Sequence, residues 1–512
     1  MERKWWTLVV VCVSIFMLLL DITVVNVALP DIQRDLDASF SDMQWVIDAY
    51  ALTLASLLLS AGTLGDQVGR RLVFGVGLVL FCLASLACGL AGSPLPLEIS
   101  RAVQGIGGSV MFALSLALIA QEFEGRERGK ALGIWGATTG AAVAIGPLVG
   151  GVLVEHLGWE WIFFVNLPVG AGALFVLFTR VRETRDPSPG RIDWAGTVTF
   201  SLSLFALVLA LVRGNAEGWG STGIVALFVA AAVLMAAFVL IERRTASPMF
   251  ELSLFRKPAF IGADTAAFAL SASMFAMFLY LTLYIQNVLG YSPLESGLRF
   301  LPVTVLSFFA AAASGNLTSR VPARFLLAIG LGLVGVGLAL MHGVQTGDDW
   351  TTLLPGFIAA GAGIGLTNPA IASSAIGVVA PARSGMASGI NTTFRQVGIA
   401  TGIAALGAVF QSQVETRLGE QLSQLPARAL GGLSEAVATL GPRAAAAAPP
   451  GQRQAVADAA RSAFVGGLND ILLIGTVVAF AGALLALLLV RQRDFLAAPV
   501  AAEPAAAAAH SS

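Results

Sequence analysis

Long, almost unbroken apolar runs decide what this chain can fold into. A helix of about 20 apolar residues is long enough to cross the hydrocarbon core of a bilayer. Fourteen runs of about that length lie at residues 7–29, 45–64, 72–92, 96–120, 131–154, 160–180, 192–212, 221–241, 260–288, 296–316, 324–342, 352–379, 389–411 and 466–490. Their polarity does not alternate every second residue, as it would in the strands of a membrane barrel. The pattern therefore predicts an all-α polytopic membrane protein.

The composition leaves too little charge to cover a water-soluble protein of this size. Of 512 residues only 12% are charged and 56% are hydrophobic, whereas soluble domains carry about 25% charged residues. A net charge of −1 gives no reason to expect a nucleic-acid partner. The 3 cysteines have no metal-binding spacing, and no phosphate-binding loop of the Gly-x-x-x-x-Gly-Lys type occurs. We therefore expect no metal, no cofactor and no enzymatic activity.

The positions of Lys and Arg predict the orientation, because cytoplasmic loops are enriched in these residues. With the N-terminus inside, the predicted cytoplasmic segments hold Arg3, Lys4, Arg70, Arg71, Arg126, Arg128, Lys130, Arg180, Arg182, Arg185, Arg191, Arg243, Arg244, Arg256, Lys257, Arg320, Arg324, Arg383, Arg491 and Arg493. The short outer loops hold only Arg34, Arg213 and Arg299. An even number of spans returns the chain to the starting side, so both termini are predicted to be cytoplasmic. The Ala- and Gly-rich composition favours a bacterial cytoplasmic membrane.

Two pairs of related segments indicate an internal repeat. Residues 62–71 (GTLGDQVGRR) follow the second span, and residues 315–324 (GNLTSRVPAR) follow the tenth. Residues 126–133 open the fifth span, and residues 383–389 open the thirteenth, each with Arg followed by small residues. Repeated halves are typical of secondary transporters, which bind substrate between the halves.

The repeat divides the chain into predicted domains. We expect an N-terminal six-helix bundle at 1–182, two linker transmembrane helices at 183–245 and a C-terminal six-helix bundle at 246–495. A long outer loop at 412–465 contains either short amphipathic helices or largely disordered chain. Residues 496–512 are rich in Ala and Pro and are predicted to be a disordered cytoplasmic tail.

Four stretches carry polar or small residues that an apolar span does not need. They are residues 20–30 (LDITVVNVALP), 62–71, 101–108 (RAVQGIGG) and 136–151 (GATTGAAVAIGPLVGG). Together they resemble the signatures of the major facilitator superfamily, in particular its fourteen-helix drug:proton antiporter family, over residues 7–493. The resemblance implies a major facilitator fold with two six-helix bundles plus two extra linker helices, 14 transmembrane helices in all.

The first predicted site concerns proton coupling. Asp21 lies well inside the first span, where a charged carboxylate is costly and usually marks an ion pathway. Arg101 lies inside the fourth span; it can hold a neighbouring carboxylate ionised, and the resemblance implies a role in proton transfer. Asp48 opens the second span and is the third candidate. The alternative is structural: a hydrogen-bonded Asp21, a purely structural ion pair for Arg101, and a hydrated Asp48.

The second and third sites follow from the other signatures. A conformational latch is predicted from Gly62, Gly65, Asp66, Gly69, Arg70, Arg71, Arg126 and Arg128. Asp66 can pair with an Arg or cap a helix N-terminus, which would hold one bundle to the other in one conformation only. The motif of antiporter members is predicted from Gly136, Gly140, Gly146, Pro147, Gly150 and Gly151. These residues form a small-residue ridge, and Pro147 removes one backbone hydrogen bond. The alternatives are loop capping and ordinary packing.

The fourth site is a substrate cavity between the bundles. Its candidate residues are Asn26, Gln104, Tyr280, Tyr284, Gln286, Asn391 and Arg395. An aromatic stripe such as Tyr280 and Tyr284 is also common in ordinary packing, so both interpretations stay open.

The chain is thus interpreted as a proton-driven antiporter that exports lipophilic, often cationic, small molecules, driven by the proton gradient alone. Its partners would be the substrate, protons and the lipid bilayer, and it would function as a monomer. Three alternatives remain: a dedicated exporter of one metabolite or lipid, a proton-symport importer, and a non-transporting receptor.

Overall fold

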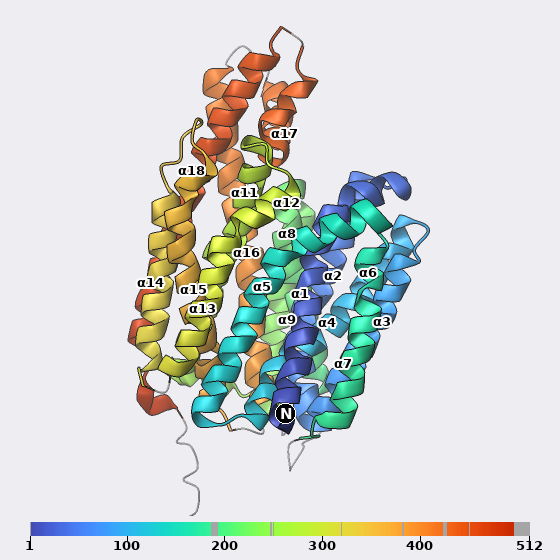
Figure 1. The fold of residues 1–512 in the computed structure, drawn as a ribbon, viewed down its shortest axis with the longest axis vertical. Coiled ribbons are helices and arrows are strands. Elements are labelled where there is room, and N and C mark those ends of the chain that lie inside the picture. The colour runs from blue at the N-terminus through green and yellow to red at the C-terminus, as the bar shows by residue number, and fades with distance from the viewer. Residues whose placement is uncertain are drawn as a thin grey trace, which may run out of the picture.

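The computed structural model describes residues 2–185, 193–245, 248, 250–318, 320–380, 383–422, 427–449 and 451–495. The side chains of Asn26, Arg126 and Pro147 lie outside the described part, as does the predicted tail at 496–512. The described residues form helices and no strand, and the long helices run side by side (Figure 1).

The helices of the first half and the linker precede those of the second half. They are α1 (Arg3–Asp35), α2 (Phe40–Val68), α3 (Arg70–Gly89), α4 (Pro94–Glu122), α5 (Gly125–Leu157), α6 (Trp161–Phe164), α7 (Asn166–Arg180), α8 (Trp194–Glu217) and α9 (Thr222–Arg244). The second half contains α10 (Pro258–Leu270), α11 (Ala276–Leu283), α12 (Pro293–Arg299), α13 (Leu301–Leu317), α14 (Ala323–Met341), α15 (Leu354–Gly377), α16 (Ser384–Gln421), α17 (Ala427–Leu440) and α18 (Arg453–Leu489). Two π-helical turns, Ser271–Phe275 and Tyr284–Val288, flank α11 within one continuous rod.

All fourteen predicted spans coincide with helices, and the predicted fold class is confirmed. Twelve helices of the described chain are long and apolar enough to cross a membrane. Two shorter apolar segments, Leu148–Leu157 in α5 and Leu301–Gly315 in α13, lie where the other two spans are predicted. α5 runs through Pro147 without interruption.

The structure corrects one detail of the prediction and decides between the two alternatives for another. Arg213 was assigned to an outer loop but lies inside α8, because that helix extends to Glu217. The predicted loop at 412–465 is largely helical among its described residues: α16 continues to Gln421, α17 follows, and α18 begins at Arg453. A search for apolar runs does not detect these helical extensions, because a helix outside the bilayer does not need an apolar surface.

Helix packing defines two halves and a linker. α2 packs against α4, α1 against α5, and α3 against α4 in the first half; α14 packs against α15 and α18 in the second. The halves meet along α2 with α16 and along α5 with α13. α8 contacts both α2 and α16, whereas α9 packs mainly against α8. Only 17% of the most apolar 18-residue stretch of α9 is buried inside the protein. α9 therefore has the surface of a lipid-facing helix.

Candidate functional site

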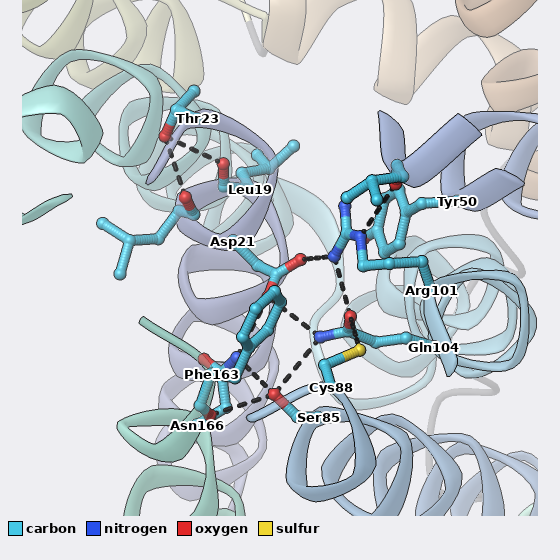
Figure 2. Close-up of polar contacts among 12 residues, drawn as sticks. Leu19, Asp21, Thr23, Tyr50, Ser85, Cys88, Arg101, Gln104, Phe163 and Asn166 are labelled. Carbon is cyan, nitrogen blue, oxygen red and sulfur yellow. Dashed lines mark hydrogen bonds and ion pairs between the residues drawn. The ribbon is translucent and has the colours of Figure 1, made fainter. Parts of the chain in front are cut away.

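A buried ion pair joins α1 and α4 (Figure 2). Arg101 Nη1 donates a hydrogen bond to Asp21 Oδ2 at 2.5 Å, and each residue is only 2% exposed. Arg101 is held by its other groups as well: Nε donates to the carbonyl of Val46 at 3.2 Å, and Nη1 also donates to Gln104 Oε1 at 2.7 Å. The guanidinium lies 4.2 Å from the centre of the Tyr50 ring. Such contacts offset part of the cost of burying the two charges.

Three neutral side chains complete this cluster, which we call the Asp21 cluster: Asp21, Arg101, Gln104, Asn166 and Ser85. Asp21 Oδ1 accepts hydrogen bonds from Gln104 Nε2 at 2.9 Å and from Asn166 Nδ2 at 3.1 Å. Both amides also donate to Ser85 Oγ, at 3.3 and 2.9 Å. Sequence reasoning missed Asn166 and Ser85; the only available signal was a polar residue inside an otherwise apolar span.

The charges of the Asp21 cluster are balanced only while Asp21 is ionised. While Asp21 is ionised, its charge is balanced by Arg101 and it accepts three hydrogen bonds. A proton on Asp21 would leave Arg101 with one cationic charge and without its counter-ion. Because α1, α3, α4 and α7 each contribute a residue to the cluster, that change in charge would alter the contacts among four helices.

The third candidate for proton coupling, Asp48, does not belong to this cluster. It faces α8, where Asp48 Oδ2 lies 3.5 Å from Arg213 Nε. The Arg213 guanidinium also lies 4.3 Å from the centre of the Trp45 ring. Both charged side chains keep some solvent exposure, 14% for Asp48 and 11% for Arg213. The pair therefore links the N-terminal half to the linker helix.

We expect Arg213→Met to lower the free energy of unfolding by about 1–2 kcal/mol. This lies between the values for exposed pairs, ~0–1 kcal/mol, and for broken buried pairs, ~3–5 kcal/mol, because the pair is long and partly exposed. Thermal unfolding of the purified protein in detergent measures the change, with exposed Arg34→Met as the control. A loss as large as that of Arg101→Met would show that Arg213 is as strongly coupled as the buried pair.

Asp66 joins the end of α2 to the start of α16 in the other half. Asp66 Oδ1 accepts from the backbone N–H of Gly385 at 3.1 Å, and Oδ2 accepts from the N–H of Met386 at 2.9 Å. Arg70 Nε also donates to Asp66 Oδ1 at 2.8 Å, and Asp66 is 5% exposed. One carboxylate thus caps a helix N-terminus, where the helix dipole favours an anion, and pairs with an Arg on its own side.

The glycines of the repeated segments meet crosswise between the halves. A Cβ on Gly62 would strike the carbonyl oxygen of Gly385, and one on Gly389 would lie 2.8 Å from the carbonyl oxygen of Leu58. In the second interface, a Cβ on Gly129 would strike the carbonyl oxygen of Gly315. Residues 62–71 therefore contact residues 383–389, and residues 315–324 contact residues 126–133. This is the arrangement expected of two halves related by an approximate two-fold axis.

The remaining latch candidates have different neighbours. Arg71 pairs with Glu183, whose carboxylate also accepts the N–H groups of Arg71 and Leu72 at 2.9 and 3.0 Å. Glu183, which sequence reasoning missed, thus caps α3. Gly69 has a φ of +139°, which favours glycine, and Gly65 packs under the side chain of Leu114. For Arg128, Nε and Nη2 have no hydrogen-bond partner among the described residues.

The glycines of 136–151 place α5 between the two halves. A Cβ built on Gly150 would lie 3.2 Å from the side chain of Val24 in α1, and one built on Gly146 would strike Thr23. Nearer the start of α5, a Cβ built on Gly136 would lie 3.7 Å from Pro369 of α15, and one built on Gly140 would lie 3.6 Å from Ser307 of α13. Among the described residues, no neighbouring atom outside its own helix backbone lies within 4 Å of a Cβ built on Gly151.

The described residues predicted to line a cavity have different neighbours. Gln104 is 0% exposed within the Asp21 cluster. The Tyr280 hydroxyl donates to the carbonyl of Ile403 at 2.9 Å, and Tyr284, 1% exposed, lies in a π-helical turn. Asn391 Nδ2 donates to Asp264 Oδ1 at 2.9 Å inside the second half. Gln286 lies four residues before Gly290, and Arg395 lies one helical turn after Asn391 on α16.

An all-helical membrane protein whose repeated halves meet crosswise, with buried ion pairs in its spans, is organised as a secondary transporter. The chain belongs to the Major Facilitator Superfamily, whose family model matches residues 11–403. It is a transporter and not an enzyme.

Curated relatives cover most of the chain. It is 36% identical over 419 residues to the multidrug resistance protein Stp of Mycobacterium tuberculosis, covering 82% of this chain and 78% of that protein. It is also 36% identical over 421 residues to the tetracenomycin C resistance and export protein of Streptomyces glaucescens, covering 80% and 77%.

A solved structure shows the same fold. The proton:xylose symporter XylE matches with a TM-score of 0.63 and 14% identity, over 95% of this chain and 96% of that one.

Proposed function

We propose that this transporter is a proton-coupled antiporter that exports lipophilic, often cationic, small molecules across a bacterial cytoplasmic membrane. The observation that carries the proposal is the buried Asp21–Arg101 pair, a titratable carboxylate with a fixed counter-ion inside the membrane. The direction of transport is supported by the relatives, which are named for resistance and export. The fold alone does not decide it, since XylE is a symporter.

In the proposed cycle, a proton and the substrate bind alternately. Protonation of Asp21 removes the counter-ion of Arg101 and frees the α1–α4 contact to rearrange. The contacts of Asp66 with Gly385 and Met386 hold the predicted cytoplasmic ends of the halves together in one conformation and break in the other. Both termini would be cytoplasmic, the glycine ridge of α5 would be the surface along which the halves rock, and one chain would suffice for transport. Asp48 is proposed as a second, more exposed proton acceptor.

The test uses the full chain in proteoliposomes with an imposed pH gradient and a fluorescent lipophilic cation. We expect the wild type to move the dye against its gradient and Asp21→Asn to reduce this movement at least tenfold, because an amide cannot carry the proton. Glu217→Gln, at an exposed carboxylate that ends α8, is the matched control and should transport normally.

The outcomes separate the alternatives. Dye transport that persists in Asp21→Asn and after collapse of the pH gradient contradicts proton coupling through Asp21. A correctly inserted protein that never moves the dye supports a dedicated exporter. Dye accumulation in the direction of proton flow supports a symporter.

A further inference from the structure

A small cavity lies outside the Asp21 cluster, between the linker helix α8 and the helices α2 and α4. Its volume is about 200 Å³. It is lined by Leu57, Ser60, Ala61, Thr63, Leu64, Gln67, Ile106, Ser109, Val110, Asp193, Trp194 and Thr197. Most of these side chains are apolar or small, and none is Lys or Arg.

One wall of the cavity is a buried carboxylate. Asp193 is the N-cap of α8, where Oδ1 accepts the N–H of Gly196 at 2.8 Å. The other oxygen, Oδ2, is buried and has no hydrogen-bond partner within the described part of the chain, and the residue is 8% exposed. Leaving a buried acceptor without a donor is unfavourable, and more so when the acceptor is charged. The cap alone therefore does not account for an acid at this position, since Asn or Ser caps a helix equally well.

A second acceptor lies beside Asp193 in the cavity wall. Gln67 Oε1, on the α2 wall, is likewise buried without a hydrogen-bond partner among described residues. The nearby hydroxyls are engaged elsewhere: Ser109 donates to the carbonyl of Ile106, and Ser60 is hydrogen-bonded to Ser201. Glu242 of α9, 4% exposed, lies within 3.0 Å of a Cβ built on Gly196 and accepts the N–H of Phe250 at 3.3 Å, so it is engaged and does not line the cavity. The cavity thus combines the Asp193 carboxylate, two acceptor oxygens without a partner among the described residues, and mostly apolar walls.

This chemistry selects a cation that also carries N–H donors. An ammonium group can place one N–H on Asp193 Oδ2 and another on Gln67 Oε1, while its apolar body lies against Leu57, Leu64 and Val110. Trp194, 64% exposed at the start of α8, offers an aromatic face to the same cation. The volume suits a head group with about one or two aromatic rings, not a whole multi-ring drug.

We infer that this cavity is a binding site for protonated lipophilic amines, formed jointly by the linker helix and the N-terminal half. The inference rests on the proposed function, because it assigns the extra helices of the transporter a part in capturing cationic substrates. It places the capture site on α8, at the predicted cytoplasmic side, apart from the residues that carry the proton.

Binding of three matched probes to the purified full chain tests the inference by calorimetry. The probes share one naphthylethyl body and end in a primary ammonium, a trimethylammonium or a hydroxyl group. We expect Asp193→Asn, which keeps the helix cap, to raise the Kd of the ammonium probe at least tenfold and that of the alcohol less than twofold. Gln67→Met should weaken the primary ammonium several-fold and leave the trimethylammonium, which has no N–H, unchanged. Val110→Trp should fill the cavity and abolish binding.

Glu217→Gln, at the exposed far end of α8, is the control for location, and it should leave the Kd of the ammonium probe within twofold of wild type. The inference is overturned if Asp193→Asn and Val110→Trp leave the Kd of the ammonium probe unchanged, or if Glu217→Gln raises that Kd as much as Asp193→Asn does. If the amine binds through Asp193 but no cation is exported, the site stands and the proposed function falls. If dye is exported but no amine binds, the function stands and the site falls.

Discussion

Arg101→Met is expected to abolish transport and to lower the free energy of unfolding by about 3–5 kcal/mol, the usual cost of removing one partner of a buried ion pair. Methionine fills much of the same volume, so the loss comes from charge. Asp21 would keep its bonds from Gln104 and Asn166 but lose its counter-ion at 2.5 Å. Val46 would lose the donor to its carbonyl.

A double variant separates stability from coupling. Asp21→Asn with Arg101→Met removes both charges, and we expect it to recover at least half of the stability that Arg101→Met loses, while transport stays absent. Thermal unfolding in detergent and dye transport in proteoliposomes measure the two effects, and Arg34→Met is the exposed control. If Arg101→Met unfolds at the wild-type temperature, the pair contributes nothing to stability. If the double variant is less stable than both single variants, charge balance is not what holds the cluster.

The sequence could predict the spans because each is an apolar run bounded by polar turns, and the fold class follows from them. It could also place Asp21 and Arg101 inside spans, since a charge in an apolar run is visible at once. The pairing between them was only one physical option, because 80 residues separate them. Sequence reasoning misses Asn166 and Ser85 because single polar residues in apolar runs are common, and only tertiary packing places Asn166 against Asp21 and Ser85 against the two amides.

The substrate cavity could not be predicted in the same way. A tyrosine or amide in a span has the same sequence signature whether it faces another helix or a cavity, and Tyr280 and Asn391 face partners within the second half. Asp48 was grouped with Asp21 by residue type, but its partner Arg213 lies on the linker helix. The apolar pattern ends the predicted span at residue 212, one residue before Arg213, although α8 continues to Glu217.

Where the repeated segments cross, α2 and α16 pack so closely that there is no room for a side chain at Gly385 of α16. A Cβ on Gly385 would lie 2.5 Å from Asp66 Oδ1 and 2.6 Å from the carbonyl oxygen of Gly62. The second contact is with backbone, which cannot move aside as a flexible side chain can. The segment at 315–324 has Ser319 where 62–71 has Asp66, so the sequence provides no carboxylate at the matching position of the second interface.

Gly385→Val is therefore expected to lower dye transport more than tenfold by separating α2 from α16 at the predicted cytoplasmic end. Spin labels on exposed Lys130 and Arg320, placed on opposite halves in a cysteine-free background, should show a longer mean distance. Gly332→Val is the matched control, because a Cβ there would have no described neighbour within 4 Å outside its own helix backbone. Asp66→Asn, which adds no bulk, should shift the distance the same way but less, because it weakens the acceptor for Gly385 and Met386. Wild-type transport and distances in Gly385→Val would contradict the latch, because a contact this close could not survive the added methyl groups in a rigid interface.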